Sequence, residues 1–324
     1  MSVLPHAHRP SATLVLARDL VHSTRSVRRG EVLRINRGVY ALRDEWTRLA
    51  PWEQYVTRVK AHALWHPDDV LCLESAAALG GLPVIGGSHD IHVLDSRAAT
   101  TRRAVGVRVH TASSDDRRIV ERDGIRMTSV ADTCIDIARS RHAAVALAVA
   151  DAAVTCDAAL RPIDLVAMNE DRASSRGRRY ARWPLHRADP GAESALESLS
   201  RACVEWHGFA DPELQVRFGS GDRADLWWPS HAVVGEADGH LKYDGRFGDA
   251  VDALRAREAR DRRLRGCGVR AVVHWTWDDI VHPTSLSAML RGAGLPVLAP
   301  PDEGRLASLR RILRPSPARE TAPR

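Results

Sequence analysis

Acidic side chains occupy facing positions on two segments that read as neighbouring β-strands, RADLWW from 223 and AVVGEAD from 232. If the connection after Pro229 is a turn of two or four residues, Asp225 lies directly opposite Glu236 on one face. Asp238 shares that face because side chains alternate along a strand with a period of two. Facing carboxylates repel each other, and a cation that prefers oxygen ligands, such as Mg²⁺, would offset the repulsion. The spacing predicts a magnesium site with Asp225, Glu236 and Asp238 as ligands.

Two further features indicate phosphodiester hydrolysis as the chemistry of this site. Glu193 and Glu197 lie four residues apart on one side of an expected helix, so one of them can reach the acidic face. Lys242, one of only two lysines in the chain, continues the strand face beyond Asp238. A metal ion polarises a phosphate and lowers the pKa of bound water, and a nearby lysine can orient the hydroxide for in-line attack.

The elements that position these residues follow in the order α-β-β-β-α-β-α. The first helix begins at Asp189-Pro190, a favourable N-cap and first-turn pair, and runs to about Trp206. We expect the remaining strands and helices, in chain order, at 213–218, 223–228, 232–238, 247–264, 269–275 and 278–290.

This region resembles the PD-(D/E)XK nuclease superfamily, specifically the group similar to very-short-patch repair endonucleases. The resemblance is carried by ESALES (193–198), RADLWWP (223–229), VVGEADGH (233–240), REARDRRLRGCGVRAV (257–272) and WTWDDI (275–280). It implies a restriction-endonuclease-like domain with an αβββαβ core over 190–298. In it, Asp225 matches the central aspartate, Glu236 the acid of the E-x-K motif, and Glu197 the helix acid. The candidate catalytic residues are therefore Glu197, Asp225, Glu236, Asp238 and Lys242.

The chain departs from the family pattern at the motif lysine. The residue two places after the motif glutamate is Asp238, so the usual water-activating ammonium is missing and Lys242 is the candidate substitute. The structural alternative is that the facing carboxylates form a solvated or salt-bridged pair, with Arg223 or Arg260 as partner. Lys242 is then an exposed residue at the end of a strand.

The first fifty residues are basic, with nine arginines against four acids, which suits a polyanionic partner. We expect two short helices and then a hairpin, at 13–21, 24–29, 31–35 and 39–42. This order predicts a winged helix-turn-helix over 11–48. The segment VRRGEVLRINRGVYAL resembles the wing of the AbiEi family of antitoxins, which implies DNA binding. The candidate nucleic-acid contacts are Arg25, Arg28, Arg29, Arg34 and Arg37.

Three other segments complete the predicted organisation. Residues 51–157 resemble the middle region of AbiEi-like proteins through ESAAALGGLP, IHV and GIRMTSVADTCIDIAR, and are expected to form an α/β domain without catalytic residues. The arginine-rich stretch 158–189 is predicted to be a linker or exposed helix, or alternatively a phosphate-contacting strap. Residues 299–324 are rich in Pro, Arg and Ala and are predicted to be a disordered tail.

The expected fold class is multidomain α/β. The length of 324 residues suggests more than one domain, and 44% hydrophobic residues suffice for a buried core in a chain of net charge +6. No apolar run approaches the ~18 residues of a membrane span, and the N-terminus lacks the apolar core of a signal peptide. We therefore expect a cytoplasmic protein without a membrane partner. The five cysteines form no C-x-x-C pair, and the histidines match no zinc-enzyme motif.

These features favour a Mg²⁺-dependent DNA endonuclease that its basic first domain guides to DNA. The alternative is a non-catalytic AbiEi-like antitoxin or transcriptional autoregulator with a vestigial nuclease fold, which binds DNA but cuts nothing, and for which a cognate toxin is a candidate partner. RNA binding is the least favoured option, because aromatic residues make up 5% of the chain and readers of single strands stack bases on aromatic side chains.

Overall fold

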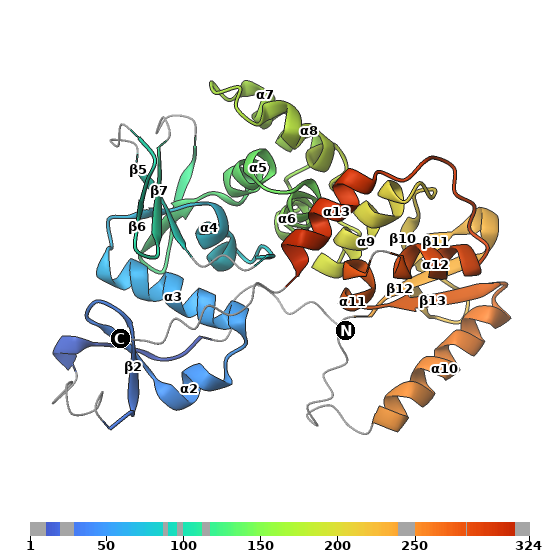
Figure 1. Cartoon of the computed structure of the whole chain (residues 1–324), viewed down its shortest axis with the longest axis horizontal. Coiled ribbons are helices and arrows are strands. Elements are labelled where there is room, and N and C mark those ends of the chain that lie inside the picture. Colours follow the sequence, from blue (N-terminus) through green and yellow to red (C-terminus); the bar gives the residue numbers. More distant parts are fainter. Residues whose placement is uncertain are drawn as a thin grey trace. The chain divides into compact units, whose positions relative to one another are not determined.

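The computed structural model describes residues 11–19, 29–86, 90–95, 100–111, 117–238, 250–282 and 284–314. The chain divides into two compact units (Figure 1). The first unit contains Met1–Arg141, Cys156–His186 and Pro315–Arg324, and the second contains His142–Thr155 and Arg187–Arg314. Each unit combines helices with a β-sheet, which agrees with the predicted α/β class. Within the described ranges, no helix is both long enough and apolar enough to cross a membrane.

The N-terminal part of the first unit is a three-stranded antiparallel sheet. Its strands are ordered β1 (Leu14–Leu16), β3 (Val39–Leu42) and β2 (Val32–Asn36). The predicted hairpin forms, and Gly38, at a φ of 70°, supplies the left-handed turn between β2 and β3. Two short elements complete this part of the chain, the 3₁₀ turn η1 (Ala17–Asp19) and helix α2 (Arg43–Arg48).

The helix predicted over 13–21 is wrong in its described part. Leu14–Leu16 is instead the edge strand β1, which pairs with β3 from Leu14 opposite Ala41 to Leu16 opposite Val39. Three aliphatic residues suit either a helix or a strand, and the free edge of the hairpin decides for the strand. The second predicted helix, 24–29, falls outside the described residues except for Arg29, which lies in a turn.

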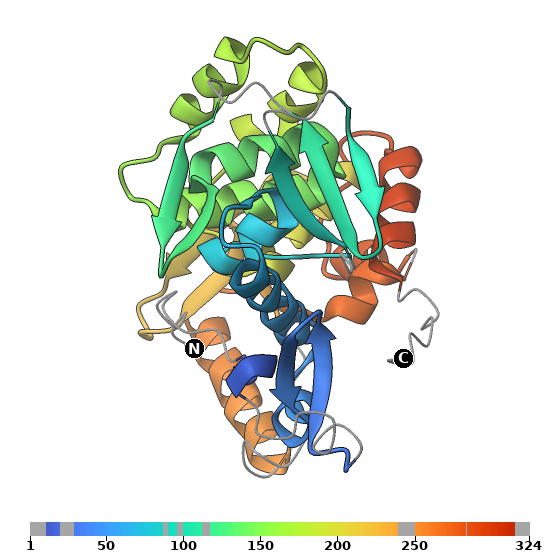
Figure 2. The ribbon, with the colours of Figure 1, turned by 90° about the vertical axis from the view of Figure 1, so that its left-hand side faces the viewer.

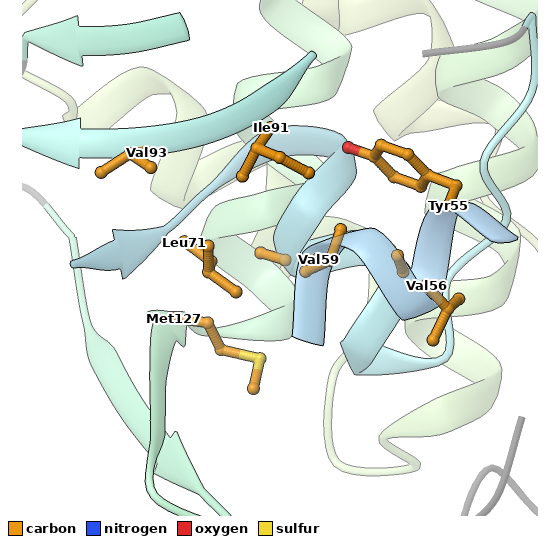
Figure 3. Close-up of a cluster of buried hydrophobic side chains, with 9 residues drawn as sticks. Tyr55, Val56, Val59, Leu71, Ile91, Val93 and Met127 are labelled. Carbon is orange, nitrogen blue, oxygen red and sulfur yellow. The ribbon is translucent and has the colours of Figure 1, made fainter. Parts of the chain in front are cut away.

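A six-stranded mixed sheet forms the larger part of the first unit, and Figure 2 shows its blue-green strands. In the order β6-β7-β5-β4-β9-β8, the strands are Arg102–Ala104, Val107–Thr111, Ile91–Asp95, Val70–Leu71, Ile125–Thr128 and Ile119–Arg122. Helices α3 (Pro51–Trp65) and α4 (Leu73–Gly80) bury their apolar sides on this sheet (Figure 3). Tyr55, Val59 and Leu71 are among the buried residues of this core.

The segment 158–189, predicted to be a linker or exposed helix, contains two helices, and these pack within the first unit. They are α7 (Pro162–Asp171) and α8 (Arg178–His186), and both pack against α5 (Val130–Ser140). Between them, the buried guanidinium of Arg172 donates to Asp132 at 2.7 Å and to Asp136 at 3.2 Å. Arginine content alone suggested an exposed connector, but these carboxylates are placed by tertiary contacts.

Between residues 195 and 292 the second unit follows the predicted α-β-β-β-α-β-α order, except that two helices stand where one was predicted over 278–290. Its elements are α9 (Ala195–Trp206), β10 (Glu213–Arg217), β11 (Arg223–Trp228), the 3₁₀ turn η3 (Pro229–His231), β12 (Val233–Ala237), α10 (Ala250–Gly266), β13 (Ala271–Trp275), α11 (Trp277–Val281) and α12 (Ser285–Gly292). The sheet order is β10-β11-β12-β13, with β12 and β13 parallel and the other pairs antiparallel.

Two helices depart from the predicted boundaries of this unit. Helix α6 (Ala143–Cys156), expected in the middle domain, has nearly all its residues in the second unit, where Asp151 accepts hydrogen bonds from Asp189 N and from Arg201. The predicted disordered tail is wrong over α13 (Glu303–Leu313), which packs against α9. Leu306 and Leu309 are buried there, so two apolar residues one helical turn apart are enough to dock it.

Candidate active site

The predicted register of the two acidic strands is confirmed. Strand β11 pairs with β12 from Leu226 opposite Gly235 to Trp228 opposite Val233, and residues 229–232 form the even-length connection. Extended by one residue, this register aligns Asp225 with Glu236, and the charge of Asp225 acts on Glu236. Asp225 Oδ2 accepts the backbone N–H of Ala237 at 3.0 Å. The acidic face therefore exists as an arrangement of two adjacent strands.

Glu236 is buried, with 2% of its surface exposed. Its carboxylate accepts two hydrogen bonds, both 2.9 Å long, from Arg260 of α10. Burial raises the pKa of Glu236 to about 7, the charge of Asp225 adds to the rise, and Arg260 opposes it. Arg260 is one of the two arginines expected to pair with the facing carboxylates if these acids form a salt bridge and bind no metal. Arg223, the other, instead binds Glu193 at 2.7 and 2.6 Å.

Glu197 is the acid that the helix contributes to this face. Ser194 caps α9 by accepting the N–H of Glu197, which places the acid in the first turn. Glu197 Oε2 accepts hydrogen bonds of 2.9 Å from Glu193 N and from Gln215 Nε2. Burial raises the pKa of Glu197, and the charge of Asp225 adds to the rise. Glu193 is occupied by its arginine partner, so the helix acid at this face is Glu197.

Gln215 lies between Glu197 and Asp225, and the sequence analysis missed it. On β10, Leu214 pairs with Leu226 and Val216 with Ala224, so Gln215 stands beside Asp225 on the neighbouring strand. Its φ of 53° is left-handed, an unfavourable conformation for a residue with a side chain. Burial raises the pKa of Asp225, and a hydrogen bond with Gln215 is among the contacts that oppose the rise. Gln215 Oε1 is buried without a hydrogen-bond partner in the described structure. The strand register would have located this residue.

Asp238, the third predicted metal ligand, contacts β13 and α10. Its Oδ2 atom lies 2.8 Å from His274 Nδ1 and 3.4 Å from Arg257 Nη1. The opposite ring nitrogen of His274 lies 3.1 Å from Asp261 Oδ1, so the imidazole bridges two carboxylates. Both His274 and Asp261 went unnoticed in the sequence, because the contact depends on the parallel pairing of Glu236 with His274.

Comparison with known proteins shows two relatives from Mycobacterium tuberculosis. They are the uncharacterized protein Rv2248 of strain H37Rv and the uncharacterized protein MT2308 of strain CDC 1551. Each is 34% identical to this chain over 221 residues, which cover 65% of this chain and 74% of the relative. The chain belongs to the family of these mycobacterial proteins. No family model matches it, and no solved structure matches it.

Family membership assigns no activity, because both relatives are uncharacterized proteins.

Of the other predicted site residues, Lys242, Arg25 and Arg28 lie outside the described residues. Three predicted nucleic-acid contacts are described and exposed at the hairpin, namely Arg29, Arg34 and Arg37. Arg29 lies 3.8 Å from Glu31.

Proposed function

We propose that this protein binds DNA and hydrolyses its phosphodiester bonds at the acidic face of the second unit, with Mg²⁺ as cofactor. The observation that carries the proposal is that Asp225 lies near two other acids from separate elements, Glu197 and Glu236. The pKa of each is raised by burial and by the negative charge of a neighbouring acid. Acids whose pKa values are shifted by burial and by a neighbouring charge are a recurring feature of active sites.

The donor set fits a hard divalent cation. Within the described residues, no three acidic, histidine or cysteine side chains are placed to hold a metal ion together. Mg²⁺ nevertheless needs only one or two carboxylates, with water completing its shell. Asp225, Glu197 and the unpartnered Oε1 atom of Gln215 offer oxygen ligands side by side. When bound, Mg²⁺ would supply polarisation of the phosphate and a lower pKa for water.

The remaining residues have separate roles in this proposal. Arg260, which donates to Glu236 and to the carbonyl oxygen of Arg223, places a fixed positive charge beside the carboxylates. His274, held between Asp238 and Asp261, would orient Asp238, which stands where the motif lysine is missing. The exposed hairpin arginines Arg34 and Arg37 would contact backbone phosphates, which position a protein on DNA without reading its sequence.

A binding protein without nuclease activity is the second candidate, and the Arg260–Glu236 salt bridge favours it. A guanidinium that occupies both oxygens of Glu236 already neutralises one of the proposed acids. The chain would then act as an AbiEi-like antitoxin or autoregulator that binds DNA and a toxin protein. Such a protein needs no metal, and its acidic face would only stabilise the fold.

Cleavage of supercoiled plasmid separates the two candidates. Purified protein is incubated with plasmid and Mg²⁺ or Mn²⁺, and nicking is compared among the wild type, Asp225→Asn and the exposed control Asp211→Asn. A nuclease requires loss of nicking in Asp225→Asn alone, by about a hundredfold or more. Equal nicking by wild type and Asp225→Asn rejects the assignment of this site. DNA binding without metal-dependent nicking in any form of the protein supports the second candidate.

A further inference from the structure

An open cavity of about 840 Å³ in the first unit is lined mainly by positive charge. Seven of its lining residues are arginines, from β6, β7, the segment before β8, the end of α5 and the connection between α7 and α8, and Asp136 is the one acid among the lining residues. The volume lies in the range of small-molecule sites, roughly 300–1,000 Å³. Carboxylates pair with four of these seven arginines, so positive charge predominates around the cavity and favours an anion.

Three of these arginines are held rigidly by the protein. Arg117 donates to both oxygens of Asp136, at 2.7 and 2.9 Å, and Arg141 binds both oxygens of Glu74. Arg139 donates to Asn169 Oδ1 at 2.8 Å and to the carbonyl oxygen of Ser174 at 2.7 Å. These bonds order the wall in advance, so less side-chain entropy is lost when a ligand binds.

The remaining arginines carry weakly compensated charge. Arg102 and Arg103 are exposed and lie 3.8 and 3.2 Å from Asp95 and Asp90. No described acid lies within ion-pair distance of the other two, Arg108 and Arg176. Burial and the charges of His92, Arg141 and Arg108 together lower the pKa of His110, another lining residue, to about 4.

The cavity also has hydrogen-bonding and apolar walls. His110 Nε2 lies 2.8 Å from His92 Nδ1, which fixes the His110 ring at the wall. Thr101, Thr111 and Ser140 add hydroxyl groups, and Leu73 and Leu94 provide an apolar surface. A phosphate chain suits the arginines and hydroxyls, while an organic group of nucleoside size suits the leucines. A double helix does not enter a cavity of this size.

From these contacts we propose that the cavity binds a small polyphosphate anion of the nucleoside triphosphate class, independently of the acidic face in the second unit. The planar guanidinium group of arginine donates paired hydrogen bonds to phosphate oxygens. Arg108 and Arg176, which have no described acid at ion-pair distance, would donate such bonds to the ligand. The rigid arginines Arg117, Arg139 and Arg141 set the position of the remaining phosphate oxygens.

Isothermal titration of the full-length protein tests this site, with inorganic triphosphate and ATP as probes. EDTA is present, so that metal–phosphate complexes at the second unit contribute nothing. We expect both probes to bind, and Arg108→Gln and Arg176→Gln each to weaken binding about tenfold, because each loses a charge-assisted contact. Arg122→Gln removes the same charge from an exposed position on β8 and should leave the affinity unchanged.

Three results would overturn the proposal. The first is that neither inorganic triphosphate nor ATP binds at millimolar concentration, and the second is equal weakening in the Arg122→Gln control. The third comes from a competition arm with a short DNA duplex. If the duplex displaces ATP and Arg108→Gln weakens both ligands alike, the cavity belongs to a DNA-binding surface and not to a small-molecule site.

Discussion

Arg260 donates one hydrogen bond to each carboxylate oxygen of Glu236, both at 2.9 Å. The glutamate side chain is 2% exposed and the arginine side chain 29%. A carboxylate in this position depends on its partner, because a buried charge without compensation is strongly unfavourable. The salt bridge therefore bears both on the stability of the second unit and on the availability of Glu236 for a cation.

Arg260→Ala should lower the free energy of unfolding by on the order of 3 kcal/mol at pH 8, since it leaves Glu236 buried and unpaired. The double variant Arg260→Ala/Glu236→Gln should recover part of the loss, because the uncompensated charge is gone. Arg257→Ala is the control, since its side chain is 38% exposed and 3.4 Å from Asp238, and should cost less than about 1 kcal/mol. Urea denaturation measures all four proteins, and equal losses in the two single variants would contradict the argument.

The pH dependence of stability should report the titration of Glu236. The pKa of Glu236 in the folded protein, about 7, lies above its ordinary value of 4.5. The protonated side chain therefore adds its full stabilisation to the free energy of unfolding below about pH 4.5, and this stabilisation is lost as the pH rises through about 7. Between pH 5 and pH 8 in EDTA, the wild type should lose on the order of 3 kcal/mol more stability than Glu236→Gln. Glu258→Gln, an exposed change on the same helix as Arg260, should follow the wild type. Parallel curves for wild type and Glu236→Gln would show that Glu236 titrates normally.

The salt dependence of DNA binding should identify the hairpin contacts. Each phosphate contact releases counterions, and its loss makes the negative slope of log K against log [salt] shallower by about 0.9. Arg34→Gln and Arg37→Gln should each make the slope less negative by about this amount and weaken binding to any sequence alike. Fluorescence anisotropy with a labelled duplex at several salt concentrations measures the slope. An unchanged slope in both variants would exclude the hairpin as a phosphate-contacting surface.

Arg172 should be essential for the first unit to fold stably. Its side chain is 5% exposed and pairs with Asp132 and Asp136, which are 3% and 9% exposed. Arg172→Ala leaves two buried carboxylates less compensated and should cost about 3–5 kcal/mol. Arg179→Ala, an exposed change on α8, should lie within about 0.5 kcal/mol of the wild type. A loss below 1 kcal/mol for Arg172→Ala would indicate that this segment is the connector its composition suggested.

Helix α13 should contribute to the core of the second unit. Leu309 is 1% exposed, whereas Leu298 is 67% exposed on the chain that leads to the helix. Leu309→Ala should cost about 2–5 kcal/mol by loss of buried apolar surface and formation of a cavity. Leu298→Ala should lie within about 0.5 kcal/mol of the wild type. Limited proteolysis gives an independent readout, since cleavage within 303–313 of the wild type at the rate of an unfolded peptide would contradict docking.

Much of the acidic face could be predicted because strands obey a simple geometry. The even connection after Trp228 and the two-residue period together place Asp225 against Glu236, and no distant contact is needed for that result. The element order of the second unit followed from the same local patterns. The helix over 13–21 failed for the opposite reason. Leu14–Leu16 is too short for periodicity to decide, and its pairing partner lies 25 residues away at Val39–Ala41.

The amino-acid sequence by itself determined the register between β11 and β12 and the acidic residues that share one face of this strand pair. Side-chain alternation and turn length are local properties of the backbone. Tertiary structure alone decided which of those acids are compensated. Arg260 reaches Glu236 from 24 residues further along the chain, His274 meets Asp238 only through the parallel strand β13, and Arg172 finds Asp132 from 40 residues away. The free energy of a charge depends on its burial and on every charge near it, and these are settled only when the whole unit has packed.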